Sequence, residues 1–367
     1  MATQITNYQC PACMGPLHFV GESGMLECDY CGSRFSVEDV EKEYAAKNEK
    51  AEDNFEKAQS QEESQSLEES QFQDESQPGM KAYVCPSCAS EIVCDENTAA
   101  TSCPYCGNPT VVPGQFRGEL KPDYIIPFKL SHEEAKKALK QFYKGKRLLP
   151  KEFSGENRIQ KLQGVYVPFW LYDSEVEADV TFDGTIVEKH RDGDYDVTET
   201  SYYEIYRKGS IPFCHVPVDA SEHMPDGHMD AIEPFDYDQM KPFSMAYLPG
   251  YLAERYGKTA EESAQRAETR MENTALDLVR KDVQGFTNFH IKKKDVRIRE
   301  KKASYVLLPV YLLTTKYQGK DYLFAMNGQT GRFIGDLPIS KKKYWMYFGG
   351  ILTGCTVILG TLLMLLL

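Results

Sequence analysis

Residues 10–31 read CPACMGPLHFVGESGMLECDYC and hold two Cys-x2-Cys pairs with fourteen residues between them. Residues 85–106, CPSCASEIVCDENTAATSCPYC, repeat this frame with the same spacing. In both stretches a proline follows the first cysteine, and a glycine follows the last one, at Gly32 and Gly107. Glycine suits a turn that needs a positive φ. The two stretches are therefore an internal repeat of one small, turn-rich fold.

Paired Cys-x2-Cys turns at this spacing predict a zinc site. Each turn supplies two thiolates, and a short hairpin between the turns brings four thiolates around one ion. We therefore expect two structural zinc ions and no other cofactor. Zinc would stabilise both ribbons, because a segment of roughly 35 residues cannot bury enough apolar surface to fold unaided. The expected ligands are Cys10, Cys13, Cys28, Cys31, Cys85, Cys88, Cys103 and Cys106.

Two alternatives would explain the same cysteines. A disulfide framework needs an oxidising compartment, and the start MATQITNYQC lacks the basic and apolar regions of a secretory signal. A redox Cys-x-x-Cys pair is expected where a strand opens a long helix, and neither repeat has that context. Zinc binding is therefore preferred. The remaining cysteines, Cys94, Cys214 and Cys355, read as ordinary thiols without a special role.

An acidic stretch, residues 38–82, separates the first ribbon (1–37) from the second ribbon (83–113). It carries fourteen acidic and five basic residues and includes the run QSQEESQSLEESQFQDESQ. Few apolar groups and strong like charge leave little to offset the entropy cost of ordering, which predicts a disordered linker. A coil of about 45 residues spans on the order of 35 to 40 Å, so we expect the first ribbon to move freely.

The distribution of charge argues against nucleic-acid binding by the ribbons. The chain has a formal net charge of −13, most of which lies in the linker. Arg34 is the only Lys or Arg in residues 1–37, and Arg117 is the only one in residues 83–119. Nucleic-acid binding requires a basic stripe that neutralises phosphates. Nucleic acid is therefore an unexpected partner, although zinc ribbons are common in replication and transcription proteins.

The C-terminal residues 344–367 are uncharged and mostly apolar. At about 1.5 Å per residue, a helix of this length reaches about 36 Å, which predicts a transmembrane helix. Lysines at 341–343 precede it and, by the positive-inside rule, place the N-terminal side in the cytoplasm. Segment 339–367 thus predicts a single-pass protein of the cell membrane with a cytoplasmic N-terminus. Gly350 and Gly354 form a GxxxG pattern, through which a homo-oligomer can form.

Residues 114–338 have the composition of a globular domain that is large enough to bury its own core. Helices are predicted at 131–144, which starts at a serine cap, and at 258–284, which carries a thin apolar stripe and opens at Thr259 or Ser263. Alternating apolar and polar residues predict strands at 164–190, 195–207, 287–299, 304–315 and 320–326. The predicted fold is two small β zinc ribbons, an α+β cytoplasmic domain with a mostly antiparallel sheet, and one C-terminal transmembrane helix.

Two segments of this domain resemble each other: VYVPFWL at 165–171 and VLLPVYL at 306–312. Each reads as a strand that contains a proline, with a leucine three residues after it. The likeness is explained either by duplicated half-domains, with proline at an edge or bulge, or by coincidence in a β-rich sequence.

Catalytic patterns in the domain are weak. His215, His223 and His228 lie close to several aspartates, but their spacing places them on no common helix or strand face. A metal-dependent enzyme using these histidines is therefore the least favoured alternative. The tripeptide GKT at 257–259 imitates the end of a phosphate-binding loop, yet Leu252 stands where that loop requires its first glycine. We predict no catalytic residues and no enzyme.

Several motifs together resemble a known family. They are the two TFIIB-type ribbons (CPAC…CDYCG and CPSC…CPYCG), GVYVPFWLYD at 164–173, PFSMAYLPGYLAERYG at 242–257 and the C-terminal apolar segment. This combination is similar to the YdjG-like zinc-ribbon membrane proteins of Firmicutes, and the likeness covers most of the chain. The resemblance implies a membrane-attached scaffold without known catalytic residues. It also implies phage-shock-protein-like or flotillin-like partners in envelope-stress assemblies.

The favoured function is therefore a membrane-anchored zinc-ribbon adaptor or scaffold that binds proteins at the cytoplasmic face of the membrane. Tethered ribbons would present the binding surfaces, and zinc would serve their folding. Phe19, Tyr30 and Phe35 are candidates for a contact patch or, in so small a fold, for its core. The alternative is a membrane-held, nucleic-acid-associated zinc-ribbon protein of replication or transcription.

Overall fold

The computed structural model describes residues 6–45, 47–49, 80–85, 91–95, 97–103, 109–112, 120–150 and 162–366. Its strands are β1 (Thr6–Asn7), β2 (Leu17–Val20), β3 (Met25–Cys28), β4 (Arg34–Phe35), β5 (Met80–Val84), β6 (Glu91–Asp95), β7 (Thr98–Ser102), β8 (Pro109–Val111), β9 (Tyr124–Ile125), β10 (Gln163–Asp192), β11 (Tyr195–Asp219), β12 (Lys241–Pro242), β13 (Leu252–Glu254), β14 (Asn288–Tyr317), β15 (Lys320–Asn327) and β16 (Phe333–Gly335). Its helices include α2 (His132–Tyr143), α4 (Asp226–Ala231), α5 (Ala260–Lys281), α6 (Lys341–Leu366) and the short 3-10 turns η3 (Tyr237–Gln239) and η4 (Met245–Tyr247). Residues 37–45 and 47–49 are helical as well, so the predicted disordered linker begins as a helix, and its residues 50–79 lie outside the described residues.

One large sheet organises the chain. Its strands follow the order β1-β8-β7-β13-β10-β14-β15-β16, with β11 beside β10 and with β9 beside β14 and β12. Pairing is antiparallel except where β13 meets β10 and β9 meets β14. Two small sheets, β2-β3-β4 and β5-β6, belong to the ribbons.

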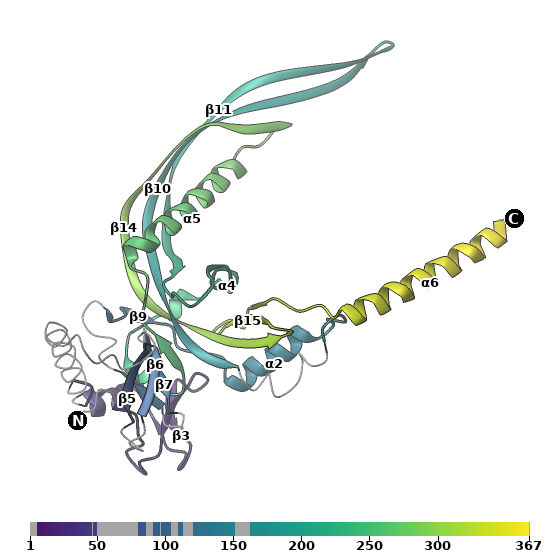
Figure 1. The fold of residues 1–367 in the computed structure, drawn as a ribbon. Helices are drawn as coiled ribbons and strands as arrows, with labels where there is room; N and C mark the ends of the chain where they lie inside the picture. The colour runs from purple at the N-terminus through teal and green to yellow at the C-terminus, as the bar shows by residue number, and fades with distance from the viewer. Residues whose placement is uncertain are drawn as a thin grey trace, which may run out of the picture.

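Three very long strands, β10, β11 and β14, form a curved arm (Figure 1). The strands expected separately at 287–299 and 304–315 are one continuous strand, β14. Even-numbered residues from Ser174 to Gly184 are buried, and the odd-numbered ones between them are at least partly exposed. Because successive side chains of a strand point to opposite faces, this alternation gives the arm one buried face.

Helix α5 covers that buried face inside the curve of the arm (Figure 1). Ala267, Met271 and Ala275 of α5 pack against β10 and β11. Thr259 caps the helix and forms a capping box with Glu262, which confirms the predicted start. Ser131 caps α2 with the same type of box, as the sequence predicts. Leu278 departs from the predicted apolar stripe of α5, since it is 46% exposed.

The two similar proline segments pair with each other across β10 and β14, with Tyr166 opposite Pro309 and Pro168 opposite Leu307. On its other side β10 changes partner near Pro168, from β13 to β11, and β14 changes partner near Pro309, from β9 to β15. A proline, which lacks a backbone N–H, is tolerated where a ladder is interrupted. Both proline carbonyls accept a backbone N–H, from Ala220 and Gly328. The likeness thus extends to the neighbouring strands, which favours duplicated halves.

Aromatic side chains form the core at the base of the arm. Phe128 stacks on Tyr251, with ring centroids 4.0 Å apart. It also makes edge contacts with Tyr166 and Tyr311, each at 4.9 Å between centroids. Gly328 approaches the ring of Phe128 so closely that a Cβ at this position would lie 2.7 Å from ring carbons. This aromatic core holds the strands β10 and β14 against the chain that joins them to the ribbons.

The ribbons are continuous with the large sheet. Strand β7 of the second ribbon pairs with β13, and β1, which precedes the first ribbon's cysteines, pairs with β8. The sequence led us to expect a freely moving first ribbon on a tether. In the structure it lies against the second ribbon and the α+β domain instead, because strand pairing and buried apolar contacts join them.

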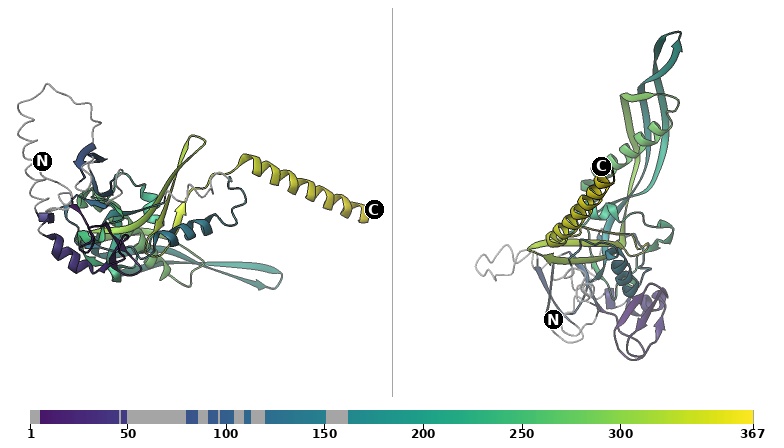
Figure 2. Two further views of the ribbon diagram at one scale, coloured as in Figure 1. Left: turned by 90° about the horizontal axis from the view of Figure 1, so that it is seen from below. Right: turned by 90° about the vertical axis from the view of Figure 1, so that its right-hand side faces the viewer.

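The C-terminal helix α6 requires a correction. It extends away from the rest of the chain (Figure 2). Within the described residues, no helix combines the length and the apolar character that crossing a membrane requires. The described side chains of α6, residues 341–361, begin with three lysines and are interspersed with glycine and threonine, which lowers their mean hydropathy. The predicted transmembrane helix is therefore wrong, and so is the predicted location as a single-pass membrane protein with a cytoplasmic N-terminus.

Candidate metal centre

Four thiols meet at one end of the β2-β3-β4 sheet. Cys10 and Cys13 lie in the turn before β2, Cys28 ends β3, and Cys31 lies in the turn before β4. All four Sγ atoms lie within 4.8 Å of one another. The Sγ atoms of Cys10 and Cys31 are 3.6 Å apart, and those of Cys13 and Cys28 are 3.5 Å apart. The sequence prediction that these four residues form one cluster is confirmed.

This geometry fits a tetrahedral ion. With Zn–S bonds of about 2.3 Å, the sulfurs of a tetrahedral site lie about 3.8 Å from one another. Cys10 and Cys28 are buried, whereas Cys13 and Cys31 are exposed, so the cluster lies at the surface of the ribbon. In the described part of the chain, no other group of three or more His, Cys, Asp or Glu side chains gathers in this way. The cluster can therefore hold one metal ion.

Backbone hydrogen bonds build the same turn twice. The N–H of Met14 donates to the carbonyl of Cys10 at 2.8 Å, and the N–H of Gly32 donates to that of Cys28 at 2.9 Å. The φ angles of Met14 and Gly32 are +63° and +70°. The positive φ predicted for Gly32 is confirmed. Met14 adopts it without being glycine, which costs free energy that the turn must offset.

Hydrogen bonds shift the pKa values of Cys13 and Cys31 in opposite directions. Hydrogen bonds with the hydroxyl and the backbone of Ser33 lower the pKa of Cys31 to about 6. At Cys13, a backbone hydrogen bond with Gly15 lowers the pKa, but hydrogen bonds with the thiols of Cys31 and Cys28 outweigh it and raise the pKa to about 12. The thiolate is the form that binds metal. Cys31 is therefore the first of these two to be available as a ligand at neutral pH.

The second predicted site is only partly visible. Cys85 and Cys103 are buried in one small apolar cluster with Ile92 and Val112. Their predicted partners, Cys88 and Cys106, lie outside the described residues, as does Gly107. Cys94 packs against the same cluster from β6, as expected for an ordinary strand residue.

Phe19 fixes the first ribbon to the α+β domain. Its backbone N–H donates to the carbonyl of Pro249 at 2.8 Å, and its ring contacts that of Tyr247 at 5.2 Å between centroids. Phe19 is 3% exposed. At Gly21, a Cβ would lie 1.9 Å from the carbonyl oxygen of Phe128, so no larger residue fits this approach. No local pattern predicts this contact, because its partners lie more than 100 residues away in the chain.

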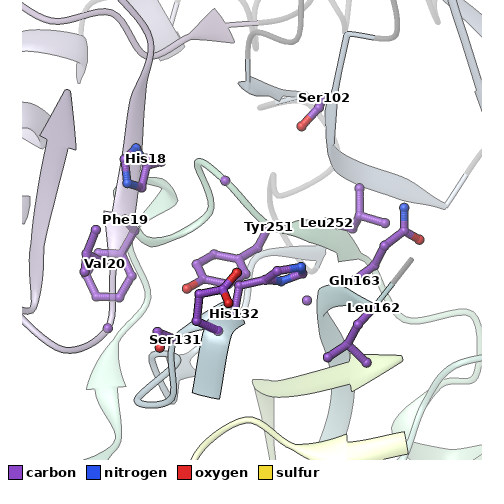
Figure 3. Close-up of a pocket in the computed structure, with 14 residues that line it drawn as sticks. His18, Phe19, Val20, Ser102, Ser131, His132, Leu162, Gln163, Tyr251 and Leu252 are labelled. Atoms are coloured by element: carbon purple, nitrogen blue, oxygen red, sulfur yellow. The ribbon is translucent and has the colours of Figure 1, made fainter. Parts of the chain in front are cut away.

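A cavity of about 510 Å³ lies at this junction (Figure 3). It is bounded by the β2 strand, the start of α2, the start of β10 and residues 250–252. In Figure 3 the side chains of His132 and Tyr251 lie between Phe19 on one side and Gln163 on the other. One wall of the cavity is thus contributed by the first ribbon, which carries the cysteine cluster.

The histidine site that the sequence left as the least favoured alternative does not assemble in the described residues. The ring of His215 contacts that of Tyr237 instead, at 5.4 Å between centroids. The nearby aspartates meet arginines of α5: Arg266 donates to Asp219 at 2.7 Å and to Asp230 at 2.6 Å. Burial raises the pKa of Asp219, although the hydrogen bond from Arg266 opposes this shift. These carboxylates are held in ion pairs rather than around an ion.

The GKT tripeptide at 257–259 also has a structural role. Lys258 forms an ion pair with Asp226 at 3.2 Å, and Thr259 caps α5. This agrees with the sequence argument that it is not a phosphate-binding loop.

The candidate contact residues of the first ribbon divide into two groups. Phe19 is buried and Phe35 is partly buried, so they belong to the packed side of the ribbon. Tyr30 is 78% exposed and Met14 is 64% exposed. Both lie in the turns that carry the cysteine cluster, directly beside Cys31 and Cys13. Sequence reasoning named Tyr30 but missed Met14, whose position after a Cys-x2-Cys pair was the available sign.

The chain is 35% identical over 353 residues to a protein of Bacillus subtilis (strain 168) named "Uncharacterized protein YdjG". The aligned region covers 95% of each of the two chains. No family model and no solved structure matches the chain.

Proposed function

The chain belongs to the family of Bacillus subtilis YdjG, and from this premise we propose that it is a zinc-ribbon adaptor that binds other proteins. One observation carries the proposal. The metal-binding turns of the first ribbon hold Met14 and Tyr30 in solvent, while the opposite side of the ribbon is packed against the α+β domain. A metal bound here would therefore shape a surface that is exposed in the part of the chain that the structure describes.

The proposed ion is zinc, with two ions per chain. Four thiolates in a tetrahedral arrangement favour zinc among the common cellular metals. The first ion would be held by Cys10, Cys13, Cys28 and Cys31, whose Sγ atoms already lie within 4.8 Å of one another. The repeat of the same cysteine frame supports a second ion in the second ribbon. When bound, zinc supplies folding free energy.

The exposed turn residues suit a protein partner. Methionine and tyrosine are enriched at protein interfaces, where their large apolar side chains become buried. The ring of Tyr30 lies over Gly15, where a Cβ would approach it to 2.5 Å. Its position therefore depends on both metal-binding turns. Loss of the ion would disorder the contact surface together with the ribbon.

The long sheet gives the adaptor a fixed frame. Because β1 pairs with β8 and β7 with β13, the first ribbon is held at one end of the arm. A partner bound at Tyr30 would thus be held at a defined place relative to the arm. Phage-shock-protein-like or flotillin-like proteins are the partners we propose, following the family resemblance.

Site-specific photo-crosslinking tests this function. We would place a photoreactive phenylalanine analogue at position 30 in the full chain, in cells, and identify captured proteins by mass spectrometry. The same analogue at Tyr124, which is 39% exposed on β9, is the matched control. We expect a defined protein to be captured from position 30 and not from position 124.

Metal dependence separates adaptor binding from chance proximity. Adding Cys13→Ser should abolish capture at position 30, because the turn that supports Tyr30 loses its ion. Equal capture from both positions, or capture that survives Cys13→Ser, would contradict the adaptor function.

A further inference from the structure

The arm has two open edges. In the described residues, β11 pairs only with β10, and β14 pairs only with β10 from Asn288 to Ala303. The pairing of β10 with β14 ends at Thr185, beyond which β10 and β11 continue as a two-stranded hairpin (Figure 1). An unpaired edge presents backbone N–H and C=O groups that can accept another strand. Natural proteins either protect such an edge against pairing with other chains or use it to bind a further strand.

The open edge of β14 is basic. Residues 288–302 carry seven basic and two acidic residues. Several of the bases are neutralised within the arm, as in the pairs of Arg299 with Glu177 and of Lys301 with Glu268. In the part of the chain that the structure describes, Lys293 and Lys302 form no ion pair. The seven bases are Lys292, Lys293, Lys294, Arg297, Arg299, Lys301 and Lys302.

The open edge of the hairpin is acidic and rich in tyrosine. Residues 192–206 carry five acidic and no basic residues. Among the described residues only Glu204 of the five forms an ion pair, with Lys292. Tyr195 and Tyr202 are 77% and 80% exposed. Of the other four acids, Asp196 and Glu199 lie on β11, Asp194 lies in the turn, and Asp192 is the last residue of β10.

The charges decide which edges can meet. Two copies of the β14 edge repel each other, and so do two copies of the hairpin edge, because like charges placed opposite each other destabilise strand pairs. A β11 edge beside a β14 edge brings Asp196 and Glu199, the unpaired acids of β11, toward Lys293 and Lys302. We propose that the hairpin edge of β11 of one copy of this chain adds to the β14 edge of a second copy. This self-association goes beyond the adaptor function and does not depend on it.

The two edges also match in length, and both can pair through backbone hydrogen bonds. The β14 segment and the acidic part of β11 are each at least twelve residues long, which exceeds an average strand. Backbone hydrogen bonds would supply the pairing, and the exposed tyrosines would gain buried surface against the neighbouring arm. The contact joins different surfaces of the two copies, so it is heterologous and propagates into a ring or a filament.

Charge reversal on each edge tests the proposal. The full chain in a non-ionic detergent, which suppresses association through the exposed α6, is measured by sedimentation velocity at about 50 mM and about 500 mM NaCl. The wild type should associate at low salt and weaken at least tenfold at high salt. An edge variant (Lys293→Glu with Lys302→Glu) and a tip variant (Asp196→Lys with Glu199→Lys) should each weaken association at least tenfold.

Combining the two charge-reversed variants tests whether the partner strand comes from a second copy of the chain. A mixture of the edge and tip variants, or one chain with all four changes, should regain association, because opposite charges again face each other. Lys137→Glu with Lys144→Glu, two exposed lysines of the α2 region, is the matched control and should change nothing. Circular dichroism checks that each variant is folded.

Three results would overturn the proposal. The wild type stays monomeric at about 100 µM and low salt. Association is lost only when Gly350 and Gly354 of α6 are replaced. Alternatively, the combined variant fails to regain association, which would point to an acidic partner other than a second copy.

Discussion

The first ribbon and the long arm both consist of strands, but different forces hold them. The ribbon's strands span two to four residues, and four thiols meet at their end. The arm's strands span 25 to 30 residues, and α5 packs its own apolar stripe against them. A unit as small as the ribbon cannot bury enough apolar surface for independent stability, whereas the arm can. We therefore expect a bound metal and side-chain packing to be separable sources of stability in these two regions.

Removal of the metal should have the largest effect, and it should act on the ribbon alone. Structural zinc contributes about 10 to 16 kcal/mol of apparent binding free energy in zinc-finger peptides at neutral pH. After chelation, or in Cys10→Ser, we expect amide hydrogen exchange to accelerate through residues 6–45 while β10 and α5 stay protected. Mass spectrometry of exchange in the full chain measures this. Equal loss of protection in the arm would show that the two regions are not separable.

Truncation of a packed residue under α5 should have the converse effect. Met271 is 1% exposed against the arm, so Met271→Ala should lower the free energy of unfolding by about 2 to 5 kcal/mol. Urea unfolding measures this change. It can be followed by the fluorescence of Trp170, which packs against the same cluster. Zinc content should not change. The matched control is Met346→Ala in α6, a methionine that is 64% exposed and should have little effect.

Loss of an ion-pair partner should lower the free energy of unfolding less than truncation of a packed side chain does. Arg266 donates to Asp219, whose side chain is fully buried, while Arg266 itself is 24% exposed. Arg266→Met leaves a buried carboxylate unpaired, and we expect a loss of about 2 kcal/mol because solvent partly screens the pair. Urea unfolding of Arg266→Met, Asp219→Asn and the double variant measures the interaction free energy between the two side chains. Strictly additive effects would show that the pair contributes nothing beyond its separate residues.

The smallest expected effect is a pH dependence at Asp219. Burial raises its folded-state pKa above the unfolded value of about 3.9. In the interval between the two values, the folded protein binds more protons than the unfolded one, so this residue makes stability fall as pH rises. Asp219→Asn should remove that slope. Thermal unfolding of the two proteins between about pH 4 and 6 measures the difference, and parallel curves would exclude the residue as its source.

Local patterns predicted local structure well. The caps at Ser131 and Thr259 start α2 and α5, because a capping box involves residues only three apart. Alternation predicted nearly the whole of β10, but only residues 195–207 of β11, which continues to Asp219. Hydropathy misled us at the C-terminus, where a run without charge was predicted to span a membrane. Lysine, glycine and threonine dilute the described part of α6 below the apolar character that a span requires.

The cysteines of the candidate site were predictable from the sequence, but the residues that surround the candidate sites in the fold were not. The spacing of Cys10, Cys13, Cys28 and Cys31 fixed one cluster, since a turn and a short hairpin are enough to close it. The histidines near Asp219 failed as a site because Arg266 comes from a helix some 40 residues further on. No spacing within the loop itself carries that information.

The sequence by itself determined the two cysteine frames, the helix starts, the alternation of the arm and the opposite charges of its edges. Each of these depends on residues close together in the chain, where covalent geometry limits the outcomes. Only the tertiary structure decided that Phe19 packs against Tyr247, that β7 joins β13, and that the first ribbon is fixed instead of tethered. Those contacts join segments more than 100 residues apart, and their free energy depends on which surfaces the whole fold brings together.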